Sequence, residues 1–202
     1  NYLEEKMQTI IDKKIGSNLN FKNEIRYKSK LYNYNNPLKF FTPNRFSSFR
    51  AHSLFFKEKD TLEWIERHGG NGKIFYDIGS NIGVYSLYYK SLFDSKVYAF
   101  EPSYKNLDIL KKNIEINNMS KNIFIIPNPI HNNASVCKFV QGRDEYASAD
   151  AGINNQKKNN FFQTISLNLD YLTENRIIDF PDLIKIDVDG NEMEILNGSK
   201  NS

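Results

Sequence analysis

The 202-residue chain has a formal net charge of +3, and 40% of its residues are hydrophobic. This composition predicts a globular domain with a real core, and the small charge gives no indication of nucleic-acid binding. No apolar run approaches the roughly 18 residues that span a bilayer. The single cysteine, Cys137, excludes an intrachain disulfide, so we expect a cytoplasmic protein.

The chain divides into an N-terminal extension, 1–57, and a regular domain, 58–202. Apolar residues recur at roughly helical spacing over residues 1–30, which predicts a charged helix. Residues 31–57 combine many aromatic side chains with two prolines, which indicates irregular or short-strand structure packed on a domain surface.

Regular alternation begins after this extension. A helix is predicted at 61–68, with Asp60 as its N-cap and Gly69-Gly70 at its end. Strands are then predicted at 73–77, 96–100 and 123–127, with helices at 83–91 and 106–117 between them. Strands that alternate with helices are typical of a parallel sheet covered by helices, so we expect a Rossmann-like α/β fold with right-handed crossovers.

The order changes after the third strand. Two strands, 136–140 and 161–167, are expected to form an antiparallel excursion, and the polar segment 142–160 between them is expected to be mobile. A short helix, a buried parallel strand and a final helix are then predicted at 168–175, 183–188 and 192–196.

A glycine turn follows the first strand of the regular part, where Asp77, Gly79, Asn81 and Gly83 lead into a helix. The turn lacks the G-x-G-x-x-G pattern of dinucleotide enzymes, which points to a cofactor without a pyrophosphate. Backbone N–H groups of such a turn receive anions, but an Asp just ahead of it would repel phosphate. It suits a ligand with an ammonium and a carboxylate, such as the methionyl end of S-adenosylmethionine. A purely structural glycine turn is the alternative.

Glu101 ends the second predicted strand, roughly 20 residues beyond the turn. An acid at this place accepts hydrogen bonds from the ribose hydroxyls of an adenosine. The alternative is a solvated acid that caps a helix. The spacing from the turn favours the ribose.

Charged residues also surround the end of the strand at 183–188, where open α/β sheets bind ligands. Lys185, Asp187 and Asp189 alternate along it and are expected to share one face. They could position a substrate, hold a metal or pair with one another, and a carboxylate buried beside another would make a general base. The three histidines show no ligand spacing, so no metal is expected.

These motifs together resemble the FkbM-type, S-adenosylmethionine-dependent methyltransferases. The segments that carry the resemblance are FYDIGSNIGVYSLYYK, VYAFEPSYKNLDILKKNIEINN and DLIKIDVDGNEMEILNG. The lead-in FFKEKDTLEWIE also resembles the segment that precedes the glycine motif in that family. The resemblance implies a class I methyltransferase fold, S-adenosylmethionine as cofactor, and O-methylation of a sugar, glycan or secondary-metabolite hydroxyl. The cofactor residues expected on this basis are Asp77, Gly79, Ser80, Asn81, Gly83, Glu101, Pro102 and Asp187, and the residues expected at the transfer site are Asp187, Asp189 and Lys185.

The sheet of this family continues beyond the strand at 183–188, which would otherwise be an apolar edge. We therefore expect a piece of a longer protein, a shortened form, or an edge covered by a partner such as a second copy.

Two other functions fit part of the pattern. An NAD-dependent oxidoreductase or epimerase shares the strand, turn and acid, but the missing third glycine and Asp77 disfavour it. A non-catalytic binding module would keep the fold without the reaction. A nucleic-acid methyltransferase that acts on an amine would need an aromatic after a polar-Pro-Pro turn, which the segment 187–190 does not offer.

Overall fold

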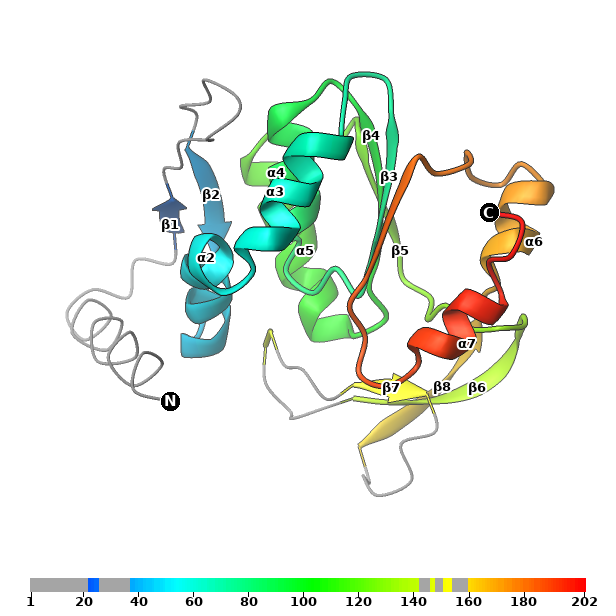
Figure 1. Ribbon diagram of the computed structural model, residues 1–202. Helices are drawn as coiled ribbons and strands as arrows, with labels where there is room; N and C mark the ends of the chain where they lie inside the picture. The colour runs from blue at the N-terminus through cyan, green and yellow to red at the C-terminus, as the bar shows by residue number, and fades with distance from the viewer. Residues whose placement is uncertain (1–21, 26–36, 142–145, 148–150, 154–159) are drawn as a thin grey trace.

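The centre of the molecule is a parallel sheet of four strands in the order β5-β4-β3-β9 (Figure 1). The computed structural model describes residues 22–25, 37–141, 146–147, 151–153 and 160–202. The strands of this sheet are β3 (Ile74–Ile78), β4 (Lys96–Phe100), β5 (Ile123–Ile126) and β9 (Leu183–Ile186). The predicted Rossmann-like α/β class is confirmed.

The strand order reverses at β3, whose two neighbours are β4 and β9. The chain moves outward from β3 to β5 and then returns to place β9 on the other side of β3. Open α/β sheets bind ligands beyond the carboxyl ends of the strands at such a point. The topology alone therefore locates the candidate site.

Helices cover both faces of the sheet, as Figure 1 shows. One face carries α4 (Val84–Leu92) and α5 (Tyr104–Ile116), with α3 (Lys59–His68) beside α4. The other carries α6 (Leu169–Glu174) and α7 (Glu192–Asn197). Successive residues of a strand point to opposite faces, so Phe75 packs in the core on the α4 side and Tyr76 in the core on the α6 side.

The N-terminal extension differs from its prediction in two places. Lys22–Ile25 is not helical but forms β1, which pairs antiparallel with β2 (Leu38–Phe41). The rest of the helix predicted at 1–30 lies outside the described residues.

A helix, α2 (Arg45–Lys57), occupies most of the second half of the segment predicted to be irregular. Pro43 precedes the helix and does not interrupt it. Asn44 caps the helix, because its side chain accepts a hydrogen bond from the Ser47 amide at 2.9 Å while the Ser47 hydroxyl lies 3.2 Å from the Asn44 amide. The aromatic content of the segment obscured this start signal.

The next helix, α3, begins at Lys59 with Glu58 as its N-cap. The prediction that Asp60 is the cap is therefore wrong: Asp60 lies in the first turn, where an acid is favoured by the helix dipole. The predicted end is confirmed, since the Gly69 amide donates to the carbonyl of Ile65.

A small antiparallel sheet separates β5 from α6 and lies near the carboxyl-end edge of the central sheet (Figure 1). Its central strand, β6 (Ser135–Val140), pairs antiparallel with β8 (Phe161–Ser166), which confirms the predicted excursion. A two-residue strand, β7 (Gly152–Ile153), was not predicted. The mobility predicted for 142–160 concerns residues that mostly lie outside the described ones. Across the described residues, no helix has both the length and the apolar character needed to cross a membrane.

Candidate functional site

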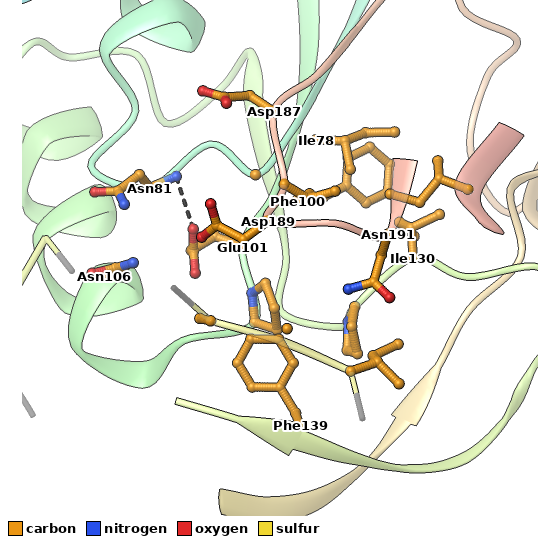
Figure 2. A pocket seen from close by; sticks show the side chains of 18 of the residues that line it. Ile78, Asn81, Phe100, Glu101, Asn106, Ile130, Phe139, Asp187, Asp189 and Asn191 are labelled. Carbon is orange, nitrogen blue, oxygen red and sulfur yellow. Dashed lines mark hydrogen bonds between the residues drawn. The ribbon is translucent and has the colours of Figure 1, made fainter. Parts of the chain in front are cut away.

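A pocket lies where the topology predicts it, between the carboxyl ends of the central strands and the small sheet (Figure 2). Six residues predicted for the site line it: Gly79, Asn81, Glu101, Pro102, Asp187 and Asp189. The other four, Asp77, Ser80, Gly83 and Lys185, are outside this lining, and all four are buried.

The glycine turn is fixed by hydrogen bonds that its backbone amides donate to other groups of the protein. The amides of Gly79 and Ser80 both donate to the carbonyl of Phe100 at 3.0 Å, and the amide of Gly83 donates to the carbonyl of Ser80. The Asn81 amide donates to the carboxylate of Glu101 at 2.8 Å. These N–H groups, which the sequence offered as partners for a ligand anion, are therefore engaged within the protein.

Gly79 is required by both its conformation and its surroundings. Its φ of 79° is in the left-handed region that glycine tolerates. A Cβ at this position would lie 2.0 Å from the carbonyl oxygen of Asp187. The end of β3 can therefore approach the end of β9 only because this residue has no side chain.

Glu101 links the turn to β4 and faces the pocket (Figure 2). One carboxylate oxygen accepts from the Asn81 amide and the other from the Ser103 amide, at 2.8 and 2.9 Å. Burial raises the pKa of Glu101 to about 7, against the lowering effect of these hydrogen bonds. The Asn106 side chain also hydrogen-bonds to this carboxylate. A carboxylate offers about four acceptor sites, so the group can still accept from a ligand hydroxyl.

Asp77 is fully buried behind the pocket. It shares the face of β3 that looks toward α4, where it accepts from the amide and hydroxyl of Ser86 at 3.1 and 2.7 Å. Lys185, its register partner on β9, lies 3.6 Å from its other oxygen. The carboxylate thus joins β3, α4 and β9.

Lys185 and Asp187 pair at 3.2 Å, which is the structural pairing that the sequence left open. Lys185 is buried among two carboxylates and the ring of Tyr85, whose centroid is 4.6 Å from its ammonium nitrogen. β9 ends at Ile186, so strand alternation does not extend to Asp189, which follows a different path through the turn at Gly190. Asp187 and Asp189 nevertheless both line the pocket.

Sequence reasoning missed the contribution of distant segments. The helix α2 and the residue after it bring charged side chains to the pocket, and the small sheet brings apolar ones. These residues are Arg50, Lys57, Glu58, Phe139 and Ile153. The cap at Asn44 could have revealed α2, but no local signal shows that α2 reaches the pocket.

Comparisons with known proteins show similarity to methyltransferases. The Methyltransferase FkbM domain family matches residues 77–202. The chain is 25% identical over 157 residues to the hexuronic acid methyltransferase AglP of Haloferax volcanii, a match over 72% of this chain. The chain spans only 57% of the length of that relative.

Solved structures of methyltransferases are also similar in part. The methyltransferase FkbM of Methylobacillus flagellatus is 17% identical, with a TM-score of 0.44, over 78% of this chain and 41% of its own. The C-terminal domain of precorrin-6Y C5,15-methyltransferase from Rhodobacter capsulatus is 17% identical, with a TM-score of 0.32, over 35% of this chain and 39% of its own. Since the family match covers more than half of the residues, the chain belongs to the FkbM methyltransferase domain family, as its motifs predicted.

Proposed function

We propose that this chain binds S-adenosylmethionine and transfers its methyl group to a hydroxyl of a sugar or glycan. Membership of a methyltransferase family supports the reaction class, and the relative named as a hexuronic acid methyltransferase supports a carbohydrate acceptor. A secondary-metabolite hydroxyl is the other acceptor of this class. The cytoplasmic location, the absence of a nucleic-acid substrate and the covering of the β9 edge by a second copy stay predictions.

The observation that carries the proposal is the contact between the glycine turn and Glu101. The 2.8 Å hydrogen bond from the Asn81 amide brings the turn after β3 and the acid after β4 to one wall of one pocket. An adenosine whose ribose hydroxyls donate to Glu101 would extend over the turn toward β9. The residues present therefore fit this cofactor.

The sulfonium of the bound cofactor supplies an activated methyl group, so the protein has to align the acceptor and remove its proton. Asp187 and Asp189 line the pocket beyond β9, where we expect the acceptor hydroxyl. Lys185 holds Asp187 through the ion pair at 3.2 Å and is a positioning residue in this scheme. Replacing Asp187 and Asp189 by Asn in turn would identify the base, because its loss should lower kcat by about 10²-fold or more.

Calorimetry with S-adenosylmethionine tests the proposal. We expect binding by the full chain, and a loss of at least about tenfold in affinity in Glu101→Ala, because hydrogen bonds to a charged group are removed. Gly79→Val should abolish binding, because its side chain would collide with Asp187. Unchanged affinity in both variants would contradict the proposal.

Two further measurements separate the alternatives. NADH fluorescence should not change on titration with the protein, whereas an oxidoreductase would bind the dinucleotide. A product assay with uronic acid and neutral sugar acceptors distinguishes a working transferase from a binding module that has lost the reaction.

A further inference from the structure

Glu58 lines the pocket but was not among the residues predicted for the site. It is the single residue between α2 and α3. The hydroxyl of Tyr85, in the first turn of α4, donates to its carboxylate at 2.6 Å. Burial, followed by the hydrogen bond to Glu58, raises the pKa of Tyr85, so this phenol stays a protonated donor at neutral pH. The Glu58 carboxylate is therefore held in place at the pocket wall.

The strand order, together with the neighbours of Tyr85, shows on which side of the glycine turn Glu58 lies. Glu101 follows β4, on one side of β3, and Asp187 follows β9, on the other. The charges of Asp187 and Asp77 both contribute to the raised pKa of Tyr85. The ammonium of Lys185 lies 4.6 Å from the centroid of the Tyr85 ring. Glu58 is thus on the β9 side. A cofactor whose ribose is held by Glu101, and which crosses the turn, has its amino-acid end near Glu58.

Charge also favours Glu58 over its acidic neighbours as a partner for a cation. Asp77 and Asp187 share the ammonium of Lys185, at 3.6 and 3.2 Å, whereas the partner of Glu58 is a neutral hydroxyl. A carboxylate that is not already neutralised by a lysine attracts a second ammonium more strongly. The amides of Gly79, Ser80, Asn81 and Gly83 already donate within the protein, which favours recognition of this end of the ligand by a side chain.

We propose that Glu58, oriented by Tyr85, accepts a charge-assisted hydrogen bond from the ammonium group of S-adenosylmethionine. This inference rests on the proposed function and names the recognition of one end of its cofactor. The sequence suggested that an acid near the glycine turn suits the ammonium of the ligand, and this inference assigns that contact to Glu58.

Two ligands isolate the ammonium: S-adenosylhomocysteine and its deamino analogue, which keeps the carboxylate and lacks only the amino group. Calorimetry on the full chain should show that Glu58→Gln weakens binding of S-adenosylhomocysteine by at least about tenfold. The same variant should bind the deamino analogue as the unchanged protein does. Gln keeps an oxygen acceptor for Tyr85, so the fold of the pocket wall is retained.

Two tyrosines of α4 provide a matched pair of further variants. Tyr85→Phe keeps the ring beside Lys185 but frees Glu58, and should weaken S-adenosylhomocysteine by a smaller factor than Glu58→Gln. Tyr88 donates to Glu66 of α3 in a similar pair, and neither residue lines the pocket. Tyr88→Phe should leave the affinity for both ligands unchanged.

Each other outcome overturns the inference. Equal weakening of both ligands by Glu58→Gln would mean a structural role. No weakening of either, with a raised KM for the acceptor, would assign Glu58 to the acceptor instead. If the unchanged chain binds neither ligand, the proposed function itself fails, and this result is distinguishable because it precedes any substitution.

Discussion

Gly79 shows how strongly the site depends on one backbone position. Its positive φ and its contact with the Asp187 carbonyl are separate requirements, because the first concerns the residue itself and the second its neighbour on β9. Gly72 has almost the same φ, 77°, but nothing lies within 4 Å of the place its Cβ would take. Gly72 is therefore a control that has the backbone conformation of Gly79 without its close contact.

We predict that Gly72→Ala lowers the free energy of unfolding by about 1 kcal/mol, the cost of a left-handed alanine. Gly79→Ala should cost about 3 kcal/mol or more, because the overlap with Asp187 forces β3 and β9 apart. Urea unfolding of both variants measures the difference. Equal losses would mean that the close approach has no energetic weight.

Glu101 predicts a pH dependence of stability. Its pKa is about 7 in the folded chain and 4.5 ordinarily, so the folded state holds this proton more tightly than the unfolded state. The contribution to stability is complete below about pH 4.5 and is lost as the pH rises to about 7, at most about 3 kcal/mol.

The check compares urea unfolding of the natural chain and Glu101→Gln at about pH 5 and about pH 8. We expect the natural chain to lose more stability than the variant between these two values. Other titrating groups affect both proteins alike and cancel in the comparison. A parallel pH dependence in both would show that Glu101 keeps an ordinary pKa in the folded chain.

The element that most changes the picture of the site is α2. It carries Arg50 and Lys57 and leads directly into Glu58, so the pocket depends on where this helix begins and ends. The sequence favoured irregular structure here because aromatic residues and prolines dominate the segment. Local composition could not show that the helix packs beside α4, since that contact is made by the tertiary fold.

Two asparagine caps test the role of α2. Asn44 caps α2 and Asn168 caps α6, each by accepting from the amide three residues on, at 2.9 and 2.8 Å. Asn44→Ala and Asn168→Ala should each lower the free energy of unfolding by about 1 kcal/mol. Only Asn44→Ala should also weaken S-adenosylhomocysteine, because α6 does not reach the pocket. Urea unfolding measures the loss of stability, and calorimetry measures the loss of affinity. Equal affinities in the two variants would contradict the prediction that α2 shapes the pocket.

On the scale of the whole molecule, the strands of the central sheet differ in their number of neighbouring strands. β4 lies between β3 and β5, whereas β9 has β3 as its one partner strand in the part of the chain that the structure describes. The two faces are both buried, so protection of the backbone depends on lateral pairing. The ligand site is at the point where these strands end.

Hydrogen exchange should reflect this arrangement. We predict that amides of β4 exchange more slowly than those of β9. Addition of S-adenosylhomocysteine should slow exchange at 78–83 and 187–191 together, because the proposed ligand bridges both segments. Protection of only one of the two segments would show that the ligand does not cross the turn toward β9.

The sequence by itself determined the strand–helix alternation, the glycine turn after β3, the place of Glu101 at the end of β4, and the family. These features depend on periodicity and on residues close together in the chain. Tertiary structure decided the rest. It buried Asp77 against Ser86, used the turn amides internally and paired Lys185 with Asp187. It also brought Glu58 to Tyr85. The last contact joins residues 27 positions apart through packing between elements, which no local pattern encodes.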